Sequence, residues 1–447
     1  MNVFWLATAI TCLGLLLQSN TWAGDTLSDV LREKGIITKE DWTRIEAANE
    51  NTKSEQTTEK LHEQFPIEVR YGKSGFELKT RDGKFGMQIQ HRLQLRYAYP
   101  FDSDPRSLSD LDQNQSSFMV RRARLKVGGH AYWPWLNYYM QYDWTQPILR
   151  DFYLNLSKFS WAQIRLGRGK VLWNDERVTS SGQQQFANRS IVNDIFTVDR
   201  QQGVQIFGRL FPGTWHDFTY YAGVFAGQGV GERDNDDANM MYTGRLQWNF
   251  LGREPPFSQS DIILSQQPVA SVAFAAMTNI SQCTAFETDA RSCRNLPGFP
   301  DPATAGATSP GQFRLDQMME EFRFRWRGLS ITHEFHWKQV VDTKKAEGDP
   351  TRQTNLMGSY AAVGFFPHVL LPAIPKQLEI AGRYAFVDPN VDRSNDIEQE
   401  RTIAVNWFFA GHANKLTFEV ARLTVADPSR SKDRAEERIR LQWDISF

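Results

Sequence analysis

The segment ERIRLQWDISF (Glu437–Phe447) ends the chain and decides the fold class. Its large apolar side chains occupy every second position: Ile439, Leu441, Trp443, Ile445 and Phe447. The positions between them are polar or charged and include Arg438 and Arg440. Because successive side chains of a strand point to opposite faces, this alternation gives one apolar and one polar face. The segment therefore predicts a strand between an apolar medium and water.

The same period of two recurs from Lys84 to the last residue. We expect strands at approximately 84–99, 116–131, 135–145, 148–158, 161–168, 202–211, 217–226, 242–251, 268–278, 316–327, 329–340, 356–366, 377–386, 400–408, 415–425 and 436–447. Short turns and long polar loops alternate between them, which is the layout of a bacterial outer-membrane barrel. The sequence thus predicts an all-β fold, a closed antiparallel transmembrane β-barrel of about 16 strands. The connection at 146–147 is very short and the one at 252–267 is long, which departs from the pattern. A total of 14 or 18 strands therefore remains an alternative.

The composition agrees with a barrel and excludes helical membrane spans. The mean hydropathy is −0.50, and no apolar run of 18 or more residues follows the N-terminal segment. Aromatic residues nevertheless make up 13% of the chain. A half-buried strand of a soluble sandwich is the alternative for each single segment. Sixteen alternating segments ending on an aromatic residue favour the outer membrane, with Phe447 as the signal for the barrel-assembly machinery and membrane lipid around the barrel.

The N-terminal region is expected to hold two further segments. Residues 1–23 resemble a signal peptide, because the apolar run Val3–Leu17 is too short to span comfortably and TWA offers a cleavage site. An N-terminal anchor is the alternative, since no Lys or Arg precedes the run. Residues 24–65 are interpreted as a periplasmic helical segment with a polar linker after Asn49, either a solvated spacer or a short coiled coil. Residues 66–447 would then form the barrel.

Two cysteines remain after removal of the expected signal peptide. Cys283 and Cys293 lie close together in a polar segment. In an exported protein this spacing favours a disulfide, and a metal pair is the alternative.

The barrel region carries a small positive charge whose position matters more than its size. Residues 66–447 hold 45 Lys and Arg against 42 Asp and Glu, a difference of +3. Alternation places many of these cations inside the barrel, and others fall in the third long loop. The pore-lining candidates are Arg122, Arg124, Lys126, Arg165, Arg168, Lys170, Arg177, Arg189, Arg245, Arg323, Arg325, Arg383, Arg438 and Arg440. Rings of Arg and Lys favour passage of oxyanions, whereas inward acids that paired with them would leave a weakly selective pore.

Several of these segments resemble a known family. FMVRRARLKVGGHAYWPWLNYYMQYDW (Phe118–Trp144) and LRDFYLNLSKFSWAQIRLGRGKVLWNDERVTSS (Leu149–Ser181) are similar to the phosphate-selective porin O/P family. The RRARL block is the most specific element. The resemblance implies a 16-stranded, trimeric barrel whose third loop narrows an anion channel for phosphate or polyphosphate.

We therefore expect an outer-membrane porin for passive diffusion of small anions such as phosphate. No cofactor, metal, nucleic-acid partner or catalytic residue is expected. A general non-selective porin is the main alternative. A barrel enzyme using scattered residues such as His130, or a structural tether, is the other class.

Overall fold

The computed structural model describes residues 27–64, 67–72, 75–104, 108–230, 234–286, 293–427 and 433–447. The expected signal peptide at 1–23 lies outside these residues. The chain divides into two compact units, Met1–Pro66 and Ile67–Phe447, and each is described by itself. Within the described ranges, no helix combines the length and the apolar character that a membrane crossing requires.

The first unit contains two helices, α2 (Leu27–Glu33) and α3 (Lys39–Gln64). Gly35 follows α2 with a φ of 66°, a conformation that stops a helix. The side chain of Thr38 accepts a hydrogen bond from the amide of Asp41 at 3.1 Å, and Asp41 accepts one from the Thr38 amide. This capping box starts α3. The helix continues through residues 50–60, so this stretch is helical rather than the linker that its polarity suggested.

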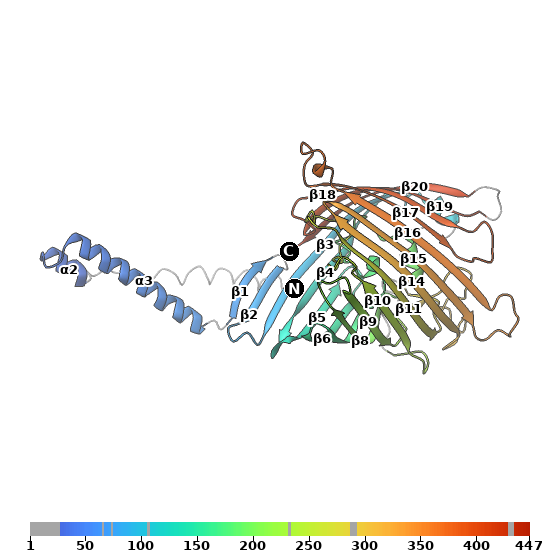
Figure 1. Cartoon of the computed structure of the whole chain (residues 1–447), viewed down its shortest axis with the longest axis horizontal. Helices are drawn as coiled ribbons and strands as arrows, with labels where there is room; N and C mark the ends of the chain where they lie inside the picture. The colour runs from blue at the N-terminus through green and yellow to red at the C-terminus, as the bar shows by residue number, and fades with distance from the viewer. Residues whose placement is uncertain are drawn as a thin grey trace, which may run out of the picture. The chain divides into compact units, whose positions relative to one another are not determined.

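The second unit is a closed antiparallel β-barrel (Figure 1). Its strands are β3 (Gly86–Tyr99), β4 (Ser117–Ala131), β5 (Trp133–Asp143), β6 (Ile148–Phe159), β7 (Ala162–Lys170), β8 (Arg200–Leu210), β9 (Phe218–Phe225), β10 (Met241–Trp248), β11 (Val269–Ser281), β14 (Phe313–Trp326), β15 (Leu329–Asp342), β16 (Gln353–Phe365), β17 (Leu378–Asp388), β18 (Glu398–Phe408), β19 (Asn414–Val425) and β20 (Arg434–Ser446). The barrel closes where β20 pairs with β3, from Ile439↔Tyr99 to Ser446↔Arg92.

The strand number is confirmed for the described residues. The sheet has 18 strands; without β1 (Ile67–Gly72) and β2 (Gly75–Thr80), 18 − 2 = 16 close the barrel. The short connection near 146 and the long one near 260 both join neighbouring strands, so 14 and 18 are excluded. The hairpin of β1 and β2 was missed in the sequence, and it pairs with the start of β3, from Phe76↔Ile89 to Lys79↔Gly86.

The two faces of the barrel wall follow the predicted alternation. On β20 the inward side chains Arg438, Arg440, Gln442 and Asp444 are at most 1% exposed. The outward Ile439, Leu441 and Trp443 are 39%, 41% and 43% exposed. The inside of this wall is therefore polar and filled, whereas the outside is apolar and open, as a lipid-facing surface requires.

Two connections fold into the barrel and fill part of its lumen. One is loop 3, residues 171–199, with the short helices α4 (Asp175–Val178) and α5 (Ile191–Phe196). Its buried apolar side chains, such as Trp173 and Phe196, form one core with inward residues of the strands, including Leu315 on β14 and Val340 on β15. The other is turn 249–268, which enters from the opposite end of the barrel. Shorter elements are η1 (Leu108–Asp112), η2 (Pro367–Val369), β12 (Ala285–Phe286) and β13 (Cys293–Arg294).

The hairpin of β12 and β13 carries the two cysteines. Cys283 and Cys293 are joined by a disulfide, with their Cα atoms 5.3 Å apart. The bond ties the start of the long loop after β11 to the paired residues Phe286 and Cys293.

Candidate functional site: a cationic cavity beside loop 3

Loop 3 is held against one half of the barrel wall by inward carboxylates. Four of its backbone amides donate to acids of the wall: Asp175 to Glu321 at 2.7 Å, Glu176 to Glu334 at 2.8 Å, Ala187 to Glu419 at 2.9 Å and Ile191 to Glu400 at 3.0 Å. These acids lie on β14, β15, β19 and β18. Because an ionised carboxylate only accepts hydrogen bonds, it suits the buried amides of an irregular loop, which need acceptors. The acids of this half therefore fix the loop.

Turn 249–268 meets loop 3 inside the lumen. The amide of Gln259 donates to the carbonyl of Gln183 at 3.0 Å, and the amide of Gln185 donates to the side chain of Gln259 at 2.9 Å. Phe257 of the turn reaches the edge of the remaining space. The sequence showed only that this connection is long. Two segments from opposite ends of the barrel thus narrow the lumen together.

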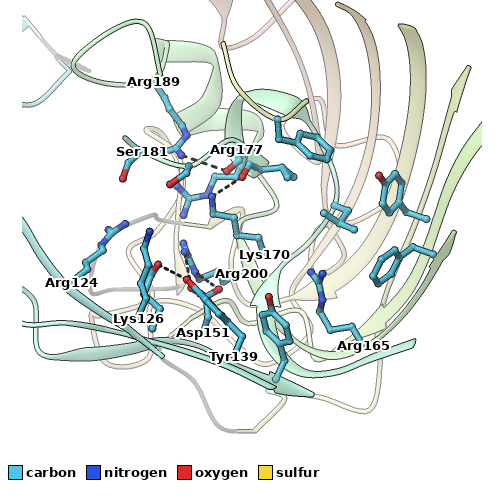
Figure 2. Close-up of a pocket in the computed structure, with 18 of the residues that line it drawn as sticks. Arg124, Lys126, Tyr139, Asp151, Arg165, Lys170, Arg177, Ser181, Arg189 and Arg200 are labelled. Atoms are coloured by element: carbon cyan, nitrogen blue, oxygen red, sulfur yellow. Dashed lines mark hydrogen bonds and ion pairs between the residues drawn. The ribbon is translucent and has the colours of Figure 1, made fainter. Parts of the chain in front are cut away.

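The space left beside loop 3 is a cavity of about 380 Å³, which we call the cationic cavity (Figure 2). Strands β4 to β9 form its wall, and loop 3 and Phe257 close it on the other side. Its lining residues are Arg122, Arg124, Lys126, Tyr139, Gln141, Asp151, Tyr153, Arg165, Lys170, Leu172, Arg177, Val178, Ser180, Ser181, Arg189, Arg200, Phe207, Tyr221 and Phe257.

Five of the lining cations form no ion pair with any carboxylate in the described part of the chain. Arg122 donates to the side-chain oxygen of Gln94 at 2.8 Å, and Lys126 donates to that of Gln90 at 3.1 Å. Lys170 donates to the carbonyl of Val178 at 2.9 Å, and Arg189 donates to that of Thr179 at 2.8 Å. The guanidinium of Arg165 stacks between the rings of Tyr153 and Phe207, 4.5 Å and 5.0 Å from their centroids. Neutral partners hold all five side chains in place and leave their charge uncompensated.

The other three lining cations are paired. Arg124 lies 2.7 Å from Asp143, Arg200 binds Asp151 through two hydrogen bonds of 2.9 Å, and Arg177 pairs with Asp199. Eight lining cations and Asp151 give 8 − 1 = +7. Asp143 and Asp199, which lie behind the lining, reduce this to 7 − 2 = +5. The cavity therefore keeps a strong positive charge.

Hydrogen-bond donors without partners add to this charge. Gln141 and Ser181 are 5% and 9% exposed at the cavity. The amide nitrogen of Gln141, the hydroxyl of Ser181 and Nε of Arg165 are buried with no hydrogen-bond partner in the described residues. Buried donors normally have partners, so these three are unsatisfied donors beside the cavity.

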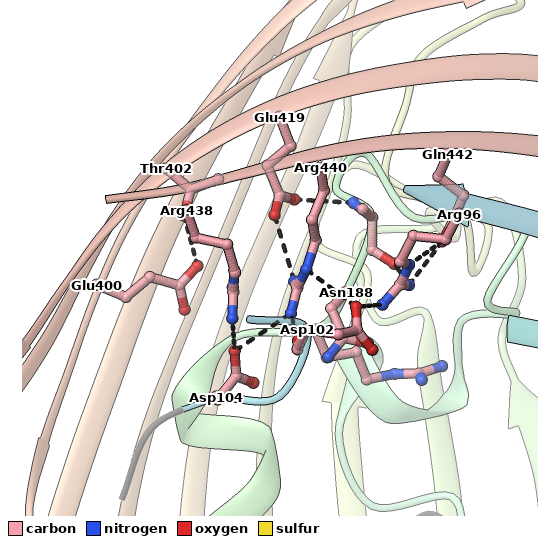
Figure 3. A network of polar contacts seen from close by, with 12 residues as sticks. Arg96, Asp102, Asp104, Asn188, Glu400, Thr402, Glu419, Arg438, Arg440 and Gln442 are labelled. Atoms are coloured by element: carbon pink, nitrogen blue, oxygen red, sulfur yellow. Dashed lines mark hydrogen bonds and ion pairs between the residues drawn. The ribbon is translucent and has the colours of Figure 1, made fainter. Parts of the chain in front are cut away.

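Most cations of the opposite wall are paired with carboxylates. Arg440 lies 3.3 Å from Glu419, Arg438 lies 2.7 Å from Asp104, and Arg96 lies 2.7 Å from Asp102 (Figure 3). Asp102 and Asp104 come from the loop after β3, which bends inward to reach them. The same holds for Arg245 with Glu321, Arg323 with Asp175 and Arg383 with Glu400, whereas Arg325 donates to backbone carbonyls including that of Ser258. Acids thus pair with most cations of this wall, although Arg325, Lys338 and Lys415 donate to neutral oxygens in the described residues.

The structure brings half of the sequence candidates together. Arg122, Arg124, Lys126, Arg165, Lys170, Arg177 and Arg189 all line the cationic cavity. Arg245, Arg323, Arg325, Arg383, Arg438 and Arg440 lie inside the barrel but in the compensated wall or beside turn 249–268. Arg168 does not line the cavity: it is opposite Phe152, whose side chain is 60% exposed on the outer face. Whether any of these residues binds an anion stays a prediction.

Sequence reasoning missed Arg200 and the aromatic side chains of the cavity. Arg200 and Lys170 are register partners at the two ends of loop 3. Counting every second position along β7 and β8 would place both side chains on the outer face. The chain turns into the lumen at these residues, so the alternation no longer predicts on which face a side chain lies. The inward positions of Tyr139, Tyr153 and Phe207 do follow from alternation, and could have been found in the sequence.

Burial changes the pKa of two charged groups of loop 3. Burial, helped by nearby Arg177, lowers the pKa of Arg189 to about 9, which leaves this side chain positively charged at neutral pH. Burial raises the pKa of Glu176 to about 7, against the opposing effect of Arg383. Glu176 accepts hydrogen bonds from the amide and hydroxyl of Ser190, both at 2.7 Å, and so connects the two halves of the loop.

Comparisons with known proteins agree with this architecture. Residues 91–260 match the model of the family Phosphate-selective porin O and P. No curated protein sequence matches the chain significantly. The resemblance predicted from Phe118–Ser181 is therefore confirmed for the region that contains β4 to β10 and loop 3.

Solved structures share the fold at very low sequence identity. OmpT, an outer membrane protein of Vibrio cholerae, is 9% identical, with a TM-score of 0.51 over 81% of this chain and 98% of its own. An anion-selective porin from Comamonas acidovorans is 11% identical, with a TM-score of 0.50 over 81% and 99%. The outer membrane channel DcaP of Acinetobacter baumannii is 11% identical, with a TM-score of 0.51 over 83% and 99%. The chain thus has the barrel fold of outer-membrane porins.

Proposed function

We propose that the protein is a porin of the bacterial outer membrane through which small anions diffuse down their gradient. The observation that carries the proposal is the cationic cavity beside the loop that narrows the lumen, with five cations that have no carboxylate partner among the described residues. Phosphate is the inorganic candidate that the family match supplies. The chemistry is passive, with selectivity supplied by side chains and with no covalent step.

The geometry favours anion passage over tight anion capture. Neutral carbonyl and amide oxygens already hold Lys170, Arg189 and Arg122, so these cations need not reorganise when an anion arrives. Each cation keeps donors for the passing ion, and several such sites in sequence allow the ion to move from one to the next. An anion therefore exchanges part of its hydration shell for side-chain donors without forming a single deep binding site.

A weakly selective general porin is the second candidate. The compensated wall favours it, because Arg438, Arg440 and Arg245 are each neutralised by a carboxylate. A pore that ran along this wall would present nearly no net charge. The cavity lies on the other wall, which is why we place anion selectivity first.

The test is the zero-current potential of purified full-length protein in a planar bilayer under a potassium chloride gradient. A potential whose sign shows that chloride is more permeant than potassium supports the proposal. A potential near zero favours the general porin, and a potential of the sign set by potassium contradicts anion passage.

Outer-membrane location, trimer formation and recognition of Phe447 by the assembly machinery are parts of the same proposal. The backbone of Phe447 pairs with His91 through hydrogen bonds of 2.7 Å and 3.0 Å, and its ring is 50% exposed. An exposed terminal ring on an accessible strand suits a recognition signal. Cross-linking of the native membrane, followed by unheated gel electrophoresis, tests the trimer.

A further inference from the structure

The cationic cavity has an aromatic side that inorganic anions do not need. Tyr139 and Tyr153 are register partners on β5 and β6 with ring centroids 5.4 Å apart. Phe207 and Tyr221 are register partners on β8 and β9 with centroids 6.0 Å apart. Arg165 on β7 lies between the two pairs. Together these side chains make a continuous aromatic surface across five strands, which we call the aromatic belt.

The rings of the belt lie close to the barrel wall over glycines. A Cβ at Gly128 would lie 3.2 Å from the ring of Tyr139, and one at Gly169 would lie 3.0 Å from the ring of Tyr153. Because glycine has no Cβ, these rings can lie against the backbone of the neighbouring strand. The belt is thus a packed part of the wall.

Arg165 adds a charge within this apolar surface. Both faces of its guanidinium are covered by rings, at 4.5 Å and 5.0 Å, and its Nε has no hydrogen-bond partner in the described residues. Only the edge of the group is left to donate. In Figure 2, Arg165 lies apart from Arg124 and Lys126, with Lys170 and Arg200 between them. The cavity therefore offers carboxylate-binding groups at both ends and an aromatic surface beside one of them.

We propose that the preferred cargo is an organic anion with a planar aromatic body, an aromatic carboxylate, rather than a compact inorganic anion. This inference rests on the proposed function as an anion porin. A strongly hydrated phosphate gains nothing from ring faces and loses water beside them. An aromatic carboxylate can stack on the belt while its carboxylate binds Arg165 or the cations around Lys170. A cavity of about 380 Å³ is also within the range that holds organic ligands, about 300–1,000 Å³.

The cavity continues beyond the belt into a second space of about 470 Å³. The two spaces share Tyr139, Tyr153 and Arg165 as lining residues. The second space is also lined by Gly86 and His130, which lie at the strand ends nearest the chain's C-terminus. Tyr139, Tyr153 and Arg165 therefore lie between the cationic cavity and the second space, where an anion that passes from one space to the other would meet them.

The test compares benzoate, acetate and phosphate as inhibitors of chloride current through the purified full-length protein in planar bilayers. The aromatic stacking contribution predicts that benzoate inhibits at a concentration roughly three- to tenfold lower than acetate or phosphate. The variants Phe207→Leu and Tyr153→Leu should remove this advantage, while the channel stays anion-selective because the other uncompensated cations of the cavity are unchanged. Phe152→Leu, which replaces a ring on the outer face of the same strand as Tyr153, is the matched control and should behave as wild type.

The outcomes separate this inference from the function on which it rests. A chloride-selective channel inhibited by benzoate no better than by acetate, or equally well in both belt variants and wild type, overturns the inference and leaves the porin proposal intact. A potassium-selective channel overturns both. Should one belt variant fail to assemble, the other carries the comparison.

Discussion

Replacing Arg122 and Lys126 by glutamine should lower anion selectivity by a calculable amount. Both side chains line the cationic cavity, and in the described residues both bind only neutral glutamines, Gln94 and Gln90. The double variant Arg122→Gln with Lys126→Gln therefore removes two uncompensated charges and lowers the local charge from +5 to +3. It leaves no buried acid without its cation, so the barrel should fold.

The magnitude follows from Coulomb's law in a water-filled pore. One charge about 8 Å from a passing ion contributes about 0.5 kcal/mol at the dielectric constant of water, so two contribute about 1 kcal/mol. The effect has opposite signs for anions and cations, which makes the difference about 2 kcal/mol before screening. With a Debye length of about 8 Å at 0.15 M salt, we expect the chloride-to-potassium permeability ratio to fall about fourfold. At 0.01 M, where the Debye length is about 30 Å, the fall should be about fifteenfold.

The assay is the zero-current potential at both salt concentrations, with a control on the opposite wall. Arg438→Gln with Asp104→Asn removes one cation and one acid and changes no net charge, and Arg440 keeps Glu419 and Asp102 as partners. This control should keep the wild-type ratio. The reasoning is refuted if the ratio of the double variant does not change, if its change does not grow at low salt, or if the control shows the same loss.

Three further predictions concern the loops and the chain end. Burial raises the pKa of Glu176 from 4.5 to about 7, so the folded state holds a proton that the unfolded state releases, and stability is lost as the pH rises from 4.5 to 7. The free energy of unfolding should therefore increase on acidification by about 3 kcal/mol at most, which raises the temperature of the barrel's thermal transition, and Glu176→Gln should remove that part. Cys283→Ser with Cys293→Ser should speed trypsin cleavage of the loop after β11 without shifting the thermal transition, and equal cleavage rates would count against a stabilising disulfide. Phe447→Ala should reduce the amount of heat-modifiable barrel in the outer membrane at equal synthesis, whereas an unchanged amount would exclude the ring as an assembly signal.

The strands could be predicted from the sequence because a barrel wall separates two media. Arg440 between Ile439 and Leu441 shows the rule: the two apolar neighbours lie on the lipid-compatible outer surface, and Arg440 faces the filled interior. This alternation can be recognised in the sequence without knowing which strands pair or which side chains are in contact. The hairpin of β1 and β2 was missed although residues 67–71 also alternate.

The sequence could not predict which inward cations are paired with acids, because this pairing depends on contacts between distant segments. The partners of Arg438 and Arg440 include Asp104 and Asp102, whose loop has no periodic pattern that shows it bending inward. Strand parity also fails at Lys170 and Arg200, where β7 and β8 enter loop 3, which explains the missed Arg200. Arg168 was misplaced because it was assigned to loop 3, whereas β7 continues to Lys170. Local alternation predicts whether a side chain faces into or out of the barrel. Whether a charged side chain has an ion-pair partner depends on the loops that fold into the lumen.

The most direct test of the uncompensated cations is to locate bound anions in a crystal of the full-length protein soaked in bromide. The anomalous signal of bromide marks each site without reference to function. We expect peaks in the cationic cavity near Lys126 and Lys170, and none beside the Arg438 and Arg440 network. Peaks confined to that network, or a cavity without bromide while other surfaces bind it, would contradict the assignment.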